Sequence, residues 1–214
     1  MKFLGYDRVL CLSPHPDDVE YSMSGTIYKH RSTLFDVVLL SHGTVSDKST
    51  SESRIHEAYE FWQSLDIDEV NLNLSQLKTS GNFDTLLDSG WVDLIEKQFT
   101  NKYKYDAIIG PSSEDSHYEH QITNRVMNSL SRSKPLSILE YKSPSTLHSW
   151  TPNLFVSLEN FYKLKTEYLR NSFKSQTDAL YFSEECIKLF HEDYNYKKRG
   201  ISSAEQFKIK TLFK

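Results

Sequence analysis

VLCLSPHPDD, Val9 to Asp18, is the stretch that decides the fold. Val9 to Leu12 forms a short apolar run, which is typical of a strand covered on both faces in a parallel sheet. Pro14 and Pro16 end this strand, because proline cannot donate to a sheet ladder and also restrains the residue before it. His15 is therefore predicted to lie just beyond the carboxyl end of the strand, at the edge where open α/β sheets bind ligands.

The polar residues that follow the strand are of the types that bind metal ions. His15 and Asp18 are three residues apart in the predicted turn and can place an imidazole and a carboxylate on one ion, with Asp17 beside them. A mixture of nitrogen and oxygen ligands suits zinc or another divalent first-row metal. The structural alternatives are a helix N-cap for Asp18 and an ordinary loop acid for Asp17.

A second polar cluster, DSHYEH at Asp115 to His120, follows another apolar run, Tyr105 to Gly110. Each cluster comes directly after a predicted core strand, so we expect the two loops to converge at one edge of the sheet. Three protein ligands and an open position would then form a catalytic rather than a structural zinc site. The alternative for His117 and His120, one helical turn apart, is an exposed helix face.

These motifs resemble those of a known family. The run from Ser13 to Asp18, with Val19-Glu20 and Ser24 to Ile27, resembles the HPDD signature of the PIG-L/LmbE-like metal-dependent N-deacetylases. His117 to His120 resembles their second signature, HxDH. HPDD after an apolar strand is a fairly specific signal, whereas HxxH alone is a weak one. Weaker similarities follow in the order that the family shows and extend the resemblance over most of the chain: Arg54, Glu57-Ala58, Ser175-Gln176 and Ala204 to Phe207.

The resemblance implies a role for each residue of the two motifs. His15, Asp18 and His120 would bind zinc, or iron(II) or another divalent metal, and Asp17 would be the general base that takes a proton from the attacking water. Protonated His117 would stabilise the developing oxyanion and help to protonate the amine. Glu119 stands where the family has an aspartate and is predicted to orient His117, although glutamate is one methylene longer.

Further residues are assigned supporting roles. Arg54 resembles a substrate-contacting arginine of the family, with a surface salt bridge as the alternative. His42, at the end of the second predicted strand, is a candidate for the pocket wall or for a structural role, and Asp115 is predicted to brace the second loop. Scaffold hydrogen bonds are the first assignment for three other positions: Glu57, Gln176 and Glu205.

Length and composition limit the protein class. The 214 residues suffice for one α/β domain and are too few for two, so we predict a single PIG-L/LmbE-like domain over 1–214. A net charge of -4 excludes a broadly basic nucleic-acid binder and favours small-molecule partners. The sequence has only two cysteines and no signal-peptide core, which predicts a cytoplasmic protein. It also has no long apolar run, which predicts that no segment is integral to a membrane. The oligomeric state stays open, a homo-oligomer included.

The order of elements predicts a Rossmann-like, doubly wound α/β fold with a mostly parallel sheet and helices on both faces. Gly25 would let the first helix pack closely against the sheet, and the polar stretch Val45 to Ser53 is expected to be a loop that lines the pocket. Strands are expected at Val9–Leu12, Phe35–Leu40, Val70–Leu74, Tyr105–Gly110, Leu136–Tyr141 and Asn153–Leu158. Helices are expected at Asp18–Arg31, from Ser51 or Ser53 to Leu65, at Trp91–Phe99, after His120, at Glu159–Phe173 and from Ser183.

The predicted activity is removal of the N-acetyl group from an N-acetylated amino sugar, a derivative of the N-acetylglucosamine type. The resemblance supplies this substrate, whereas the spacing of the metal residues by itself indicates only metal-assisted hydrolysis. One alternative is the same chemistry on another amide, such as a thiol conjugate. Another is a metal-binding or sugar-binding protein without turnover. A nucleotide site is disfavoured, because the first turn has no GxGxxG.

Overall fold

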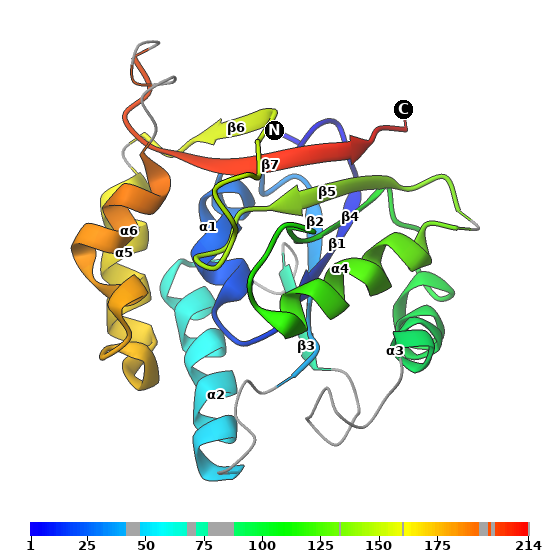
Figure 1. The fold of residues 1–214 in the computed structure, drawn as a ribbon, viewed down its shortest axis with the longest axis horizontal. Helices are drawn as coiled ribbons and strands as arrows, with labels where there is room; N and C mark the ends of the chain where they lie inside the picture. The colour runs from blue at the N-terminus through cyan, green and yellow to red at the C-terminus, as the bar shows by residue number, and fades with distance from the viewer. Residues whose placement is uncertain are drawn as a thin grey trace.

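The computed structural model describes residues 1–41, 48–67, 72–76, 88–132, 134–159, 161–192, 197 and 200–213, with the backbone alone at 48–52, 72–76 and 88–89. These residues form one mixed sheet of seven strands in the order β3-β2-β1-β4-β5-β7-β6, with helices on both faces (Figure 1). The predicted doubly wound, mostly parallel fold is confirmed. No described helix is both long and apolar enough to cross a membrane.

The strands are β1 (Arg8–Ser13), β2 (Leu34–Leu39), β3 (Leu72–Gln76), β4 (Ala107–Pro111), β5 (Ser137–Tyr141), β6 (Leu154–Ser157) and β7 (Ala204–Thr211). The α-helices are α1 (Asp18–Lys29), α2 (Lys48–Ser64), α3 (Asp88–Ile95), α4 (Tyr118–Leu130), α5 (Phe161–Ser172) and α6 (Glu184–His191). A π-helical turn at Glu96–Thr100 continues α3, and 3₁₀ turns lie at Lys174–Gln176 and Leu180–Phe182.

Strand β1 lies in the middle of the parallel part of the sheet. It pairs in parallel with β2 on one side and with β4 on the other, and β2–β3 and β4–β5 are also parallel. The carboxyl ends of these five strands therefore meet at one edge, where both predicted metal loops begin. Strand β7 is inserted antiparallel between β5 and β6. It is the one described strand for which we had no expectation.

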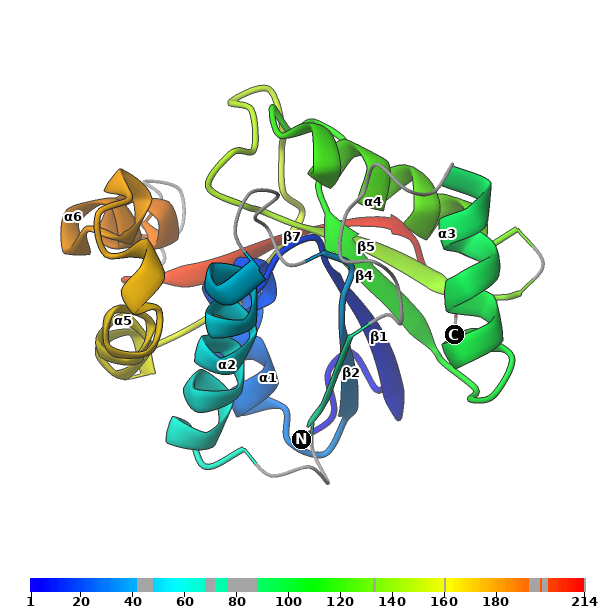
Figure 2. The same cartoon turned by 90° about the horizontal axis from the view of Figure 1, so that it is seen from below.

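The alternating side chains of β1 explain why this strand is covered on both faces. Val9 and Cys11 pack into an apolar cluster with residues of α1, α2, α5 and α6, whereas Leu10 and Leu12 pack with residues of α3 and α4. Figure 2 shows these two groups of helices on opposite sides of the sheet. All four side chains are fully buried, and Val9, Leu10 and Leu12 each contribute on the order of 1.5–3 kcal/mol by leaving water.

The second helix begins earlier than predicted. Residues 48–53 belong to α2, so the expected polar loop is wrong for this part, and Ser51 and Ser53 lie inside the helix instead of capping it. Relative to alanine, each serine or threonine lowers helix stability by only about a few tenths of a kcal/mol. These polar residues therefore do not prevent the helix from forming. Arg54 consequently lies in the second turn of α2. Residues 42–47, among them His42, are outside the described part of the chain.

Candidate functional site

The loop after β1 is held in a fixed conformation by its own polar groups. The Ser13 hydroxyl donates to the His15 carbonyl oxygen at 2.7 Å and accepts from the Val19 backbone N–H at 3.4 Å. Asp17 precedes α1 with φ 134°, a conformation that a side chain disfavours, and its backbone N–H donates to the Glu20 carboxylate at 3.2 Å. A strained backbone held in this way is often found at functional sites.

The loop after β4 is fixed mainly by Asp115. Its carboxylate accepts from the His117 backbone N–H at 2.8 Å and from the Ser143 hydroxyl at 2.5 Å. Its carbonyl oxygen accepts from the Gln121 side chain at 2.6 Å. His117 therefore stands directly before α4, and His120 lies in the first turn of that helix, facing the loop after β1.

The two loops converge as the sequence led us to expect. The Asp18 carboxylate lies between two imidazoles, with one oxygen 3.1 Å from His15 Nδ1 and the other 3.3 Å from His120 Nε2. One donor atom from each residue lies within 4.8 Å of the others. Ligands of a tetrahedral zinc ion, at roughly 2.0–2.2 Å from it, lie roughly 3.3–3.6 Å apart. The two distances from Asp18 are close to this spacing, and the buried trio has the donor set that such an ion needs.

The outer nitrogen of each of these imidazoles contacts a carboxylate. His120 Nδ1 lies 3.1 Å from Asp115 Oδ2, and His15 Nε2 contacts the Glu119 carboxylate. Metal-binding histidines are commonly supported in this way, because the partner fixes the tautomer and the ring orientation. The Glu119 contact differs from the prediction that this side chain orients His117. The longer glutamate side chain reaches His15 instead, while His117 Nδ1 accepts the Glu119 backbone N–H at 3.3 Å.

The charges of the trio are strongly coupled. Burial alone would raise the pKa of Asp18, but His120 and His15 outweigh it and hold that pKa well below its usual range. Burial lowers the pKa of both imidazoles, yet their carboxylate partners prevail, so that the pKa rises to about 9 for His15 and to about 10 for His120. Both imidazoles are thus protonated without a cation, and a binding cation must displace these protons.

Asp17 lines the same cavity as the trio and forms a buried ion pair. Its carboxylate lies 3.1 Å from Arg54 Nη2 and accepts from the Tyr181 hydroxyl at 3.4 Å. Arg54 also donates to the Pro16 carbonyl oxygen at 3.3 Å and is only 6% exposed, so it is not a surface salt bridge. Burial raises the pKa of Asp17 and the Arg54 charge opposes it, which leaves that pKa at about 6.

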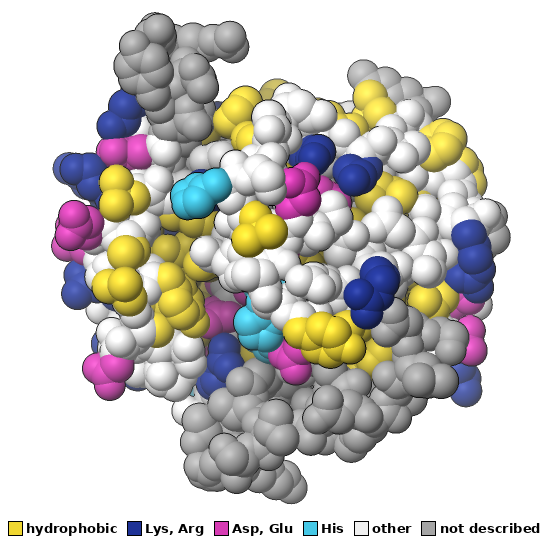
Figure 3. Space-filling model, in the orientation of Figure 1, with side chains coloured by type: hydrophobic (Ala, Val, Ile, Leu, Met, Phe, Trp, Pro, Cys, Tyr) yellow, Lys and Arg dark blue, Asp and Glu magenta, His cyan; other side chains and the backbone are white. Residues whose placement is uncertain are grey.

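These side chains line a cavity of about 330 Å³ at the carboxyl edge of the sheet. Near the centre of the face drawn in Figure 3, histidine and acidic side chains lie beside one another at the surface. Tyr181 and Pro144-Ser145 also line the cavity, and no sequence signal had pointed to them. The complete described lining consists of His15, Asp17, Asp18, Tyr21, Arg54, His117, Glu119, His120, Pro144, Ser145, Gln176 and Tyr181.

The other family positions have the contacts of scaffold residues. Glu57 accepts from the Ser175 backbone N–H at 2.8 Å and from its hydroxyl at 2.6 Å, which joins α2 to the turn after α5. Glu205 accepts from the Gly25 backbone N–H at 2.8 Å. Gln176 differs, because it lines the cavity and its amide oxygen accepts from the Tyr181 hydroxyl at 2.9 Å.

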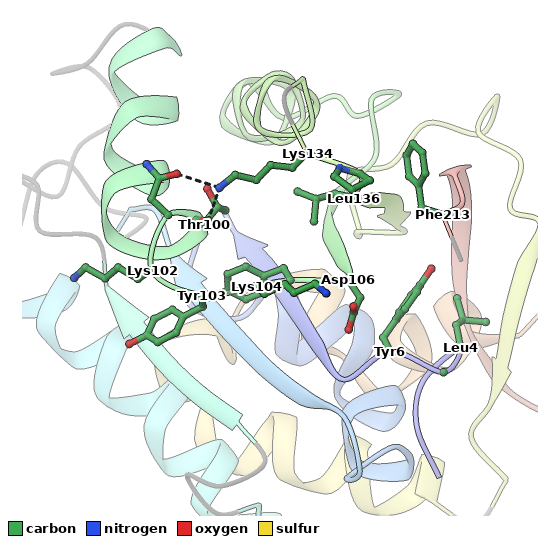
Figure 4. A pocket seen from close by; sticks show the side chains of 14 residues that line it. Leu4, Tyr6, Thr100, Lys102, Tyr103, Lys104, Asp106, Lys134, Leu136 and Phe213 are labelled. Atoms are coloured by element: carbon green, nitrogen blue, oxygen red, sulfur yellow. Dashed lines mark hydrogen bonds between the residues drawn. The ribbon is translucent and has the colours of Figure 1, made fainter.

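A larger cavity, of about 900 Å³, lies at the opposite edge of the sheet (Figure 4). It is lined by residues 4–6, 100–106, 134–136 and 213, which precede β1, β4 and β5 or follow β7. Lys134, one of its lysines, already donates to Asn101 Oδ1 at 3.0 Å. This lining contains no histidine or cysteine, so of the two cavities it is the smaller one that can hold a transition metal through nitrogen ligands.

Comparison with protein families gives one match over more than half of the chain. The family described as PIG-L, GlcNAc-PI de-N-acetylase, matches residues 10–131, a range that contains both metal loops. No protein of curated function is similar enough in sequence to match.

Solved structures with the same fold include enzymes of different activity. N,N'-diacetylchitobiose deacetylase from Pyrococcus horikoshii is 19% identical, with a TM-score of 0.71 over 97% of this chain and 85% of that one. The zinc-inhibited form of teicoplanin deacetylase Orf2 is 12% identical, with a TM-score of 0.69 over 94% of this chain and 96% of that one. GalB, the 4-carboxy-2-hydroxymuconate hydratase from Pseudomonas putida KT2440, is 14% identical, with a TM-score of 0.74 over 100% of this chain and 98% of that one. At such identities the likeness concerns the fold, and the activity has to be argued from the site.

Proposed function

The chain belongs to the PIG-L family, and from this membership we propose that it is a metal-dependent hydrolase that removes the N-acetyl group from an N-acetylated amino sugar. The observation that carries the proposal is the buried trio of His15, Asp18 and His120, with the Asp17 carboxylate beside it. The family favours hydrolysis of an amide, and the geometry favours metal-assisted hydrolysis. The sugar, of the N-acetylglucosamine type, is argued from the family alone.

His15, Asp18 and His120 would hold the cation, for which we propose zinc, with iron(II) as the alternative. When bound, such a cation supplies a Lewis acid that polarises the amide carbonyl and acidifies a water molecule. Asp115 and Glu119 would keep the two imidazoles in the tautomers whose unprotonated nitrogens face Asp18.

Asp17 is the proposed general base. Its carboxylate faces the cavity beside Asp18, and Arg54 holds it in place by the 3.1 Å ion pair. It would accept one proton from the water whose oxygen attacks the acetyl carbon. The C–N bond then breaks, the proton passes to the departing nitrogen, and the products are acetate and a free amine.

His117 is the proposed oxyanion donor, although in a different charge state from the one predicted. Burial lowers the pKa of His117, and neighbouring His15 and His120 lower it further. Because its Nδ1 accepts the Glu119 backbone N–H, the neutral ring carries its proton on Nε2. This N–H would donate a hydrogen bond to the carbonyl oxygen as negative charge develops there.

The cavity suits a compact polar group. Its volume of about 330 Å³ is at the small end for ligand pockets, so one sugar ring would fill the described part. Arg54, Gln176 and Tyr181 line one wall with donors and acceptors, whereas Ser145 lies on the segment that supports the second loop. These groups are of the kind that recognise sugar hydroxyls.

The test is release of acetate by the zinc-loaded protein from a panel of N-acetylhexosamine derivatives, nucleotide-linked and lipid-linked forms included. Asp17→Asn should lower the rate by about 10²- to 10⁴-fold with metal content unchanged. Asparagine is the chosen replacement because it has the same shape and tolerates a positive φ. Asp93→Asn, on the exposed surface of α3, is the control and should retain full activity.

The outcomes separate the alternatives. Release from an N-acylated thiol conjugate but from no sugar would assign the same chemistry to another amide. No release from any compound, with one metal ion bound per chain, would identify a binding protein and end the hydrolase proposal.

A further inference from the structure

A second group of metal-capable side chains adjoins the first on the cavity side. Donor atoms of His15, His117 and Glu119 lie within 4.8 Å of one another. His117 is exposed, and the Glu119 side chain is 24% exposed, so solvent reaches this group more readily than it reaches Asp18 and His120. Two imidazole nitrogens and a carboxylate are again a donor set that suits zinc.

The two groups share the His15 ring but use different atoms of it. Nδ1 faces the Asp18 carboxylate, and Nε2 faces the Glu119 carboxylate. These nitrogens point away from each other on an imidazole, so one cation on each would not compete for the same atom. The centroid of the His117 ring lies 4.8 Å from that of the His15 ring, and His117 directly precedes α4, whose first turn carries Glu119.

The charge around the cavity leaves room for more than one divalent cation. Asp17, Asp18 and Glu119 line it, and Asp115 stands directly behind His120, whereas Arg54 is the cationic side chain in the described lining. If the imidazoles are neutral, these four carboxylates and the one guanidinium together carry a net charge of -3. A single divalent cation leaves one of these charges uncompensated, and in a mostly buried site this favours further positive charge.

We propose that His15, His117 and Glu119 form a second divalent-cation site, weaker than the first, and that a cation there blocks the cavity. The cation would replace the proton between His15 Nε2 and Glu119, and that proton would leave to solvent. On His117 the cation would take Nδ1 in place of the Glu119 backbone N–H, so that the ring keeps its proton on Nε2. The site is weaker because the first cation repels the second and because one imidazole must serve both. Inhibition rests on the proposed function, since the cation would engage His117, but binding itself does not.

The test is a zinc titration of the metal-free protein, with stoichiometry from calorimetry and from metal analysis after equilibrium dialysis. The wild type should bind two ions per chain, one tightly and one more weakly. Glu119→Gln should keep the tight ion, because the amide oxygen can still accept from His15 Nε2–H. Glu119→Gln should bind the second ion at least about tenfold more weakly than the wild type does. Loss of a group that only hydrogen-bonds to a metal ligand already weakens metal binding by about tenfold or more.

Two variants complete the design. Asp18→Asn should lose the tight ion, and Glu114→Gln should keep both, because Glu114 lies on the same loop but pairs with Lys208 at the surface. Circular dichroism would confirm that each variant is folded. Zinc inhibition of acetate release should follow occupancy of the weak site in the wild type and be reduced in Glu119→Gln.

One ion per chain at millimolar zinc would overturn the inference and leave Glu119 as a positioning residue for His15. A second ion that Glu119→Gln binds as well as the wild type does would also overturn it, because that ion would lie elsewhere. Failure here is distinguishable from failure of the proposed function. Acetate release with only one ion bound at millimolar zinc refutes only the second site. A second ion at the weak site, with no acetate release at low zinc when only the tight site is filled, refutes only the deacetylase.

Discussion

His191 is fully buried at the end of α6, and its two ring nitrogens have different partners. Nδ1 lies 2.7 Å from the Ile187 carbonyl oxygen and must donate to it, whereas Nε2 lies 2.9 Å from the Lys165 ammonium and must accept from it. A protonated ring could not accept. Burial and the Lys165 charge accordingly hold the pKa of His191 well below its ordinary value of 6.5.

This residue should make the fold sensitive to acid. Below pH 6.5 the unfolded chain binds a proton at His191 and the native chain does not, so stability falls as the pH falls, by up to about 1.4 kcal/mol per pH unit. His191→Gln retains an acceptor for Lys165 and has no proton to bind. Urea unfolding of the metal-free wild type and variant at pH 5.0, 5.75 and 6.5 should give a smaller slope for the variant. Equal slopes would refute the argument.

The contact of Glu119 is also decided at the scale of single residues. An aspartate at this position would have a shorter reach, and the extra methylene brings the glutamate carboxylate to His15 across the gap between the two loops. Its proposed roles, in supporting His15 and in holding a second cation, both depend on that length. The extra methylene is evident from the sequence, but the sequence alone predicts the carboxylate beside His117 rather than beside His15.

Helix α1 illustrates how an element is held in position. A β-carbon on Gly25 would lie 2.1 Å from Leu158 Cδ2 and 3.1 Å from Glu205 Oε1. The Glu205 carboxylate in turn accepts from the Gly25 and Thr26 backbone N–H groups, at 2.8 and 2.6 Å, and from buried Lys165 at 2.6 Å. The predicted close approach at Gly25 is confirmed, but its partners are β7 and the segment before α5.

Gly25→Ala should therefore destabilise the fold by about 1–3 kcal/mol, the usual cost of overpacking a core. Gly110→Ala on β4 is the matched comparison, because its β-carbon would meet the Met127 sulfur at 2.9 Å. Methionine is flexible and can retreat, so this variant should lose less. Chemical denaturation gives both values. Equal losses would mean that Leu158 moves aside as easily as Met127.

At the scale of the whole molecule, the candidate metal site joins two segments about a hundred residues apart in the sequence. His15 and Asp18 follow β1, and His120 follows β4, and these strands are neighbours in the sheet. A cation that binds only the native arrangement stabilises the fold through mass action, by about 2.7 kcal/mol at a free concentration of 100 times Kd.

Zinc should therefore raise the thermal midpoint of the metal-free protein, and a chelator should reverse the change. At zinc concentrations that fill only the tight site, Asp18→Asn should abolish the increase, whereas Asp17→Asn should preserve it, because Asp17 pairs with Arg54 rather than with the trio. Magnesium, which prefers oxygen ligands in an octahedral array, should have little effect. An equal increase in Asp18→Asn would place the stabilising ion elsewhere.

The sequence by itself determined the local features of the fold and the order of its motifs. The apolar run before the prolines predicted β1, and the alternation of strands and helices predicted the parallel sheet. Because parallel strands end at a common edge, the convergence of His15, Asp18 and His120 followed as an expectation, and the family resemblance gave the same order of motifs. The single domain, the cytoplasmic location and the role of each site residue stay predictions.

Only the tertiary structure decided which side chains meet across the sheet and the cavity. Tyr181 and Pro144-Ser145 reach the cavity from segments without any chemical motif, and the partners of Glu119 and Arg54 depend on side-chain reach in three dimensions. Strand β7 is likewise decided by the tertiary structure, because its position between β5 and β6 depends on pairing with distant strands. Periodicity and spacing describe a chain along one dimension, whereas these contacts depend on how the packed elements place each side chain.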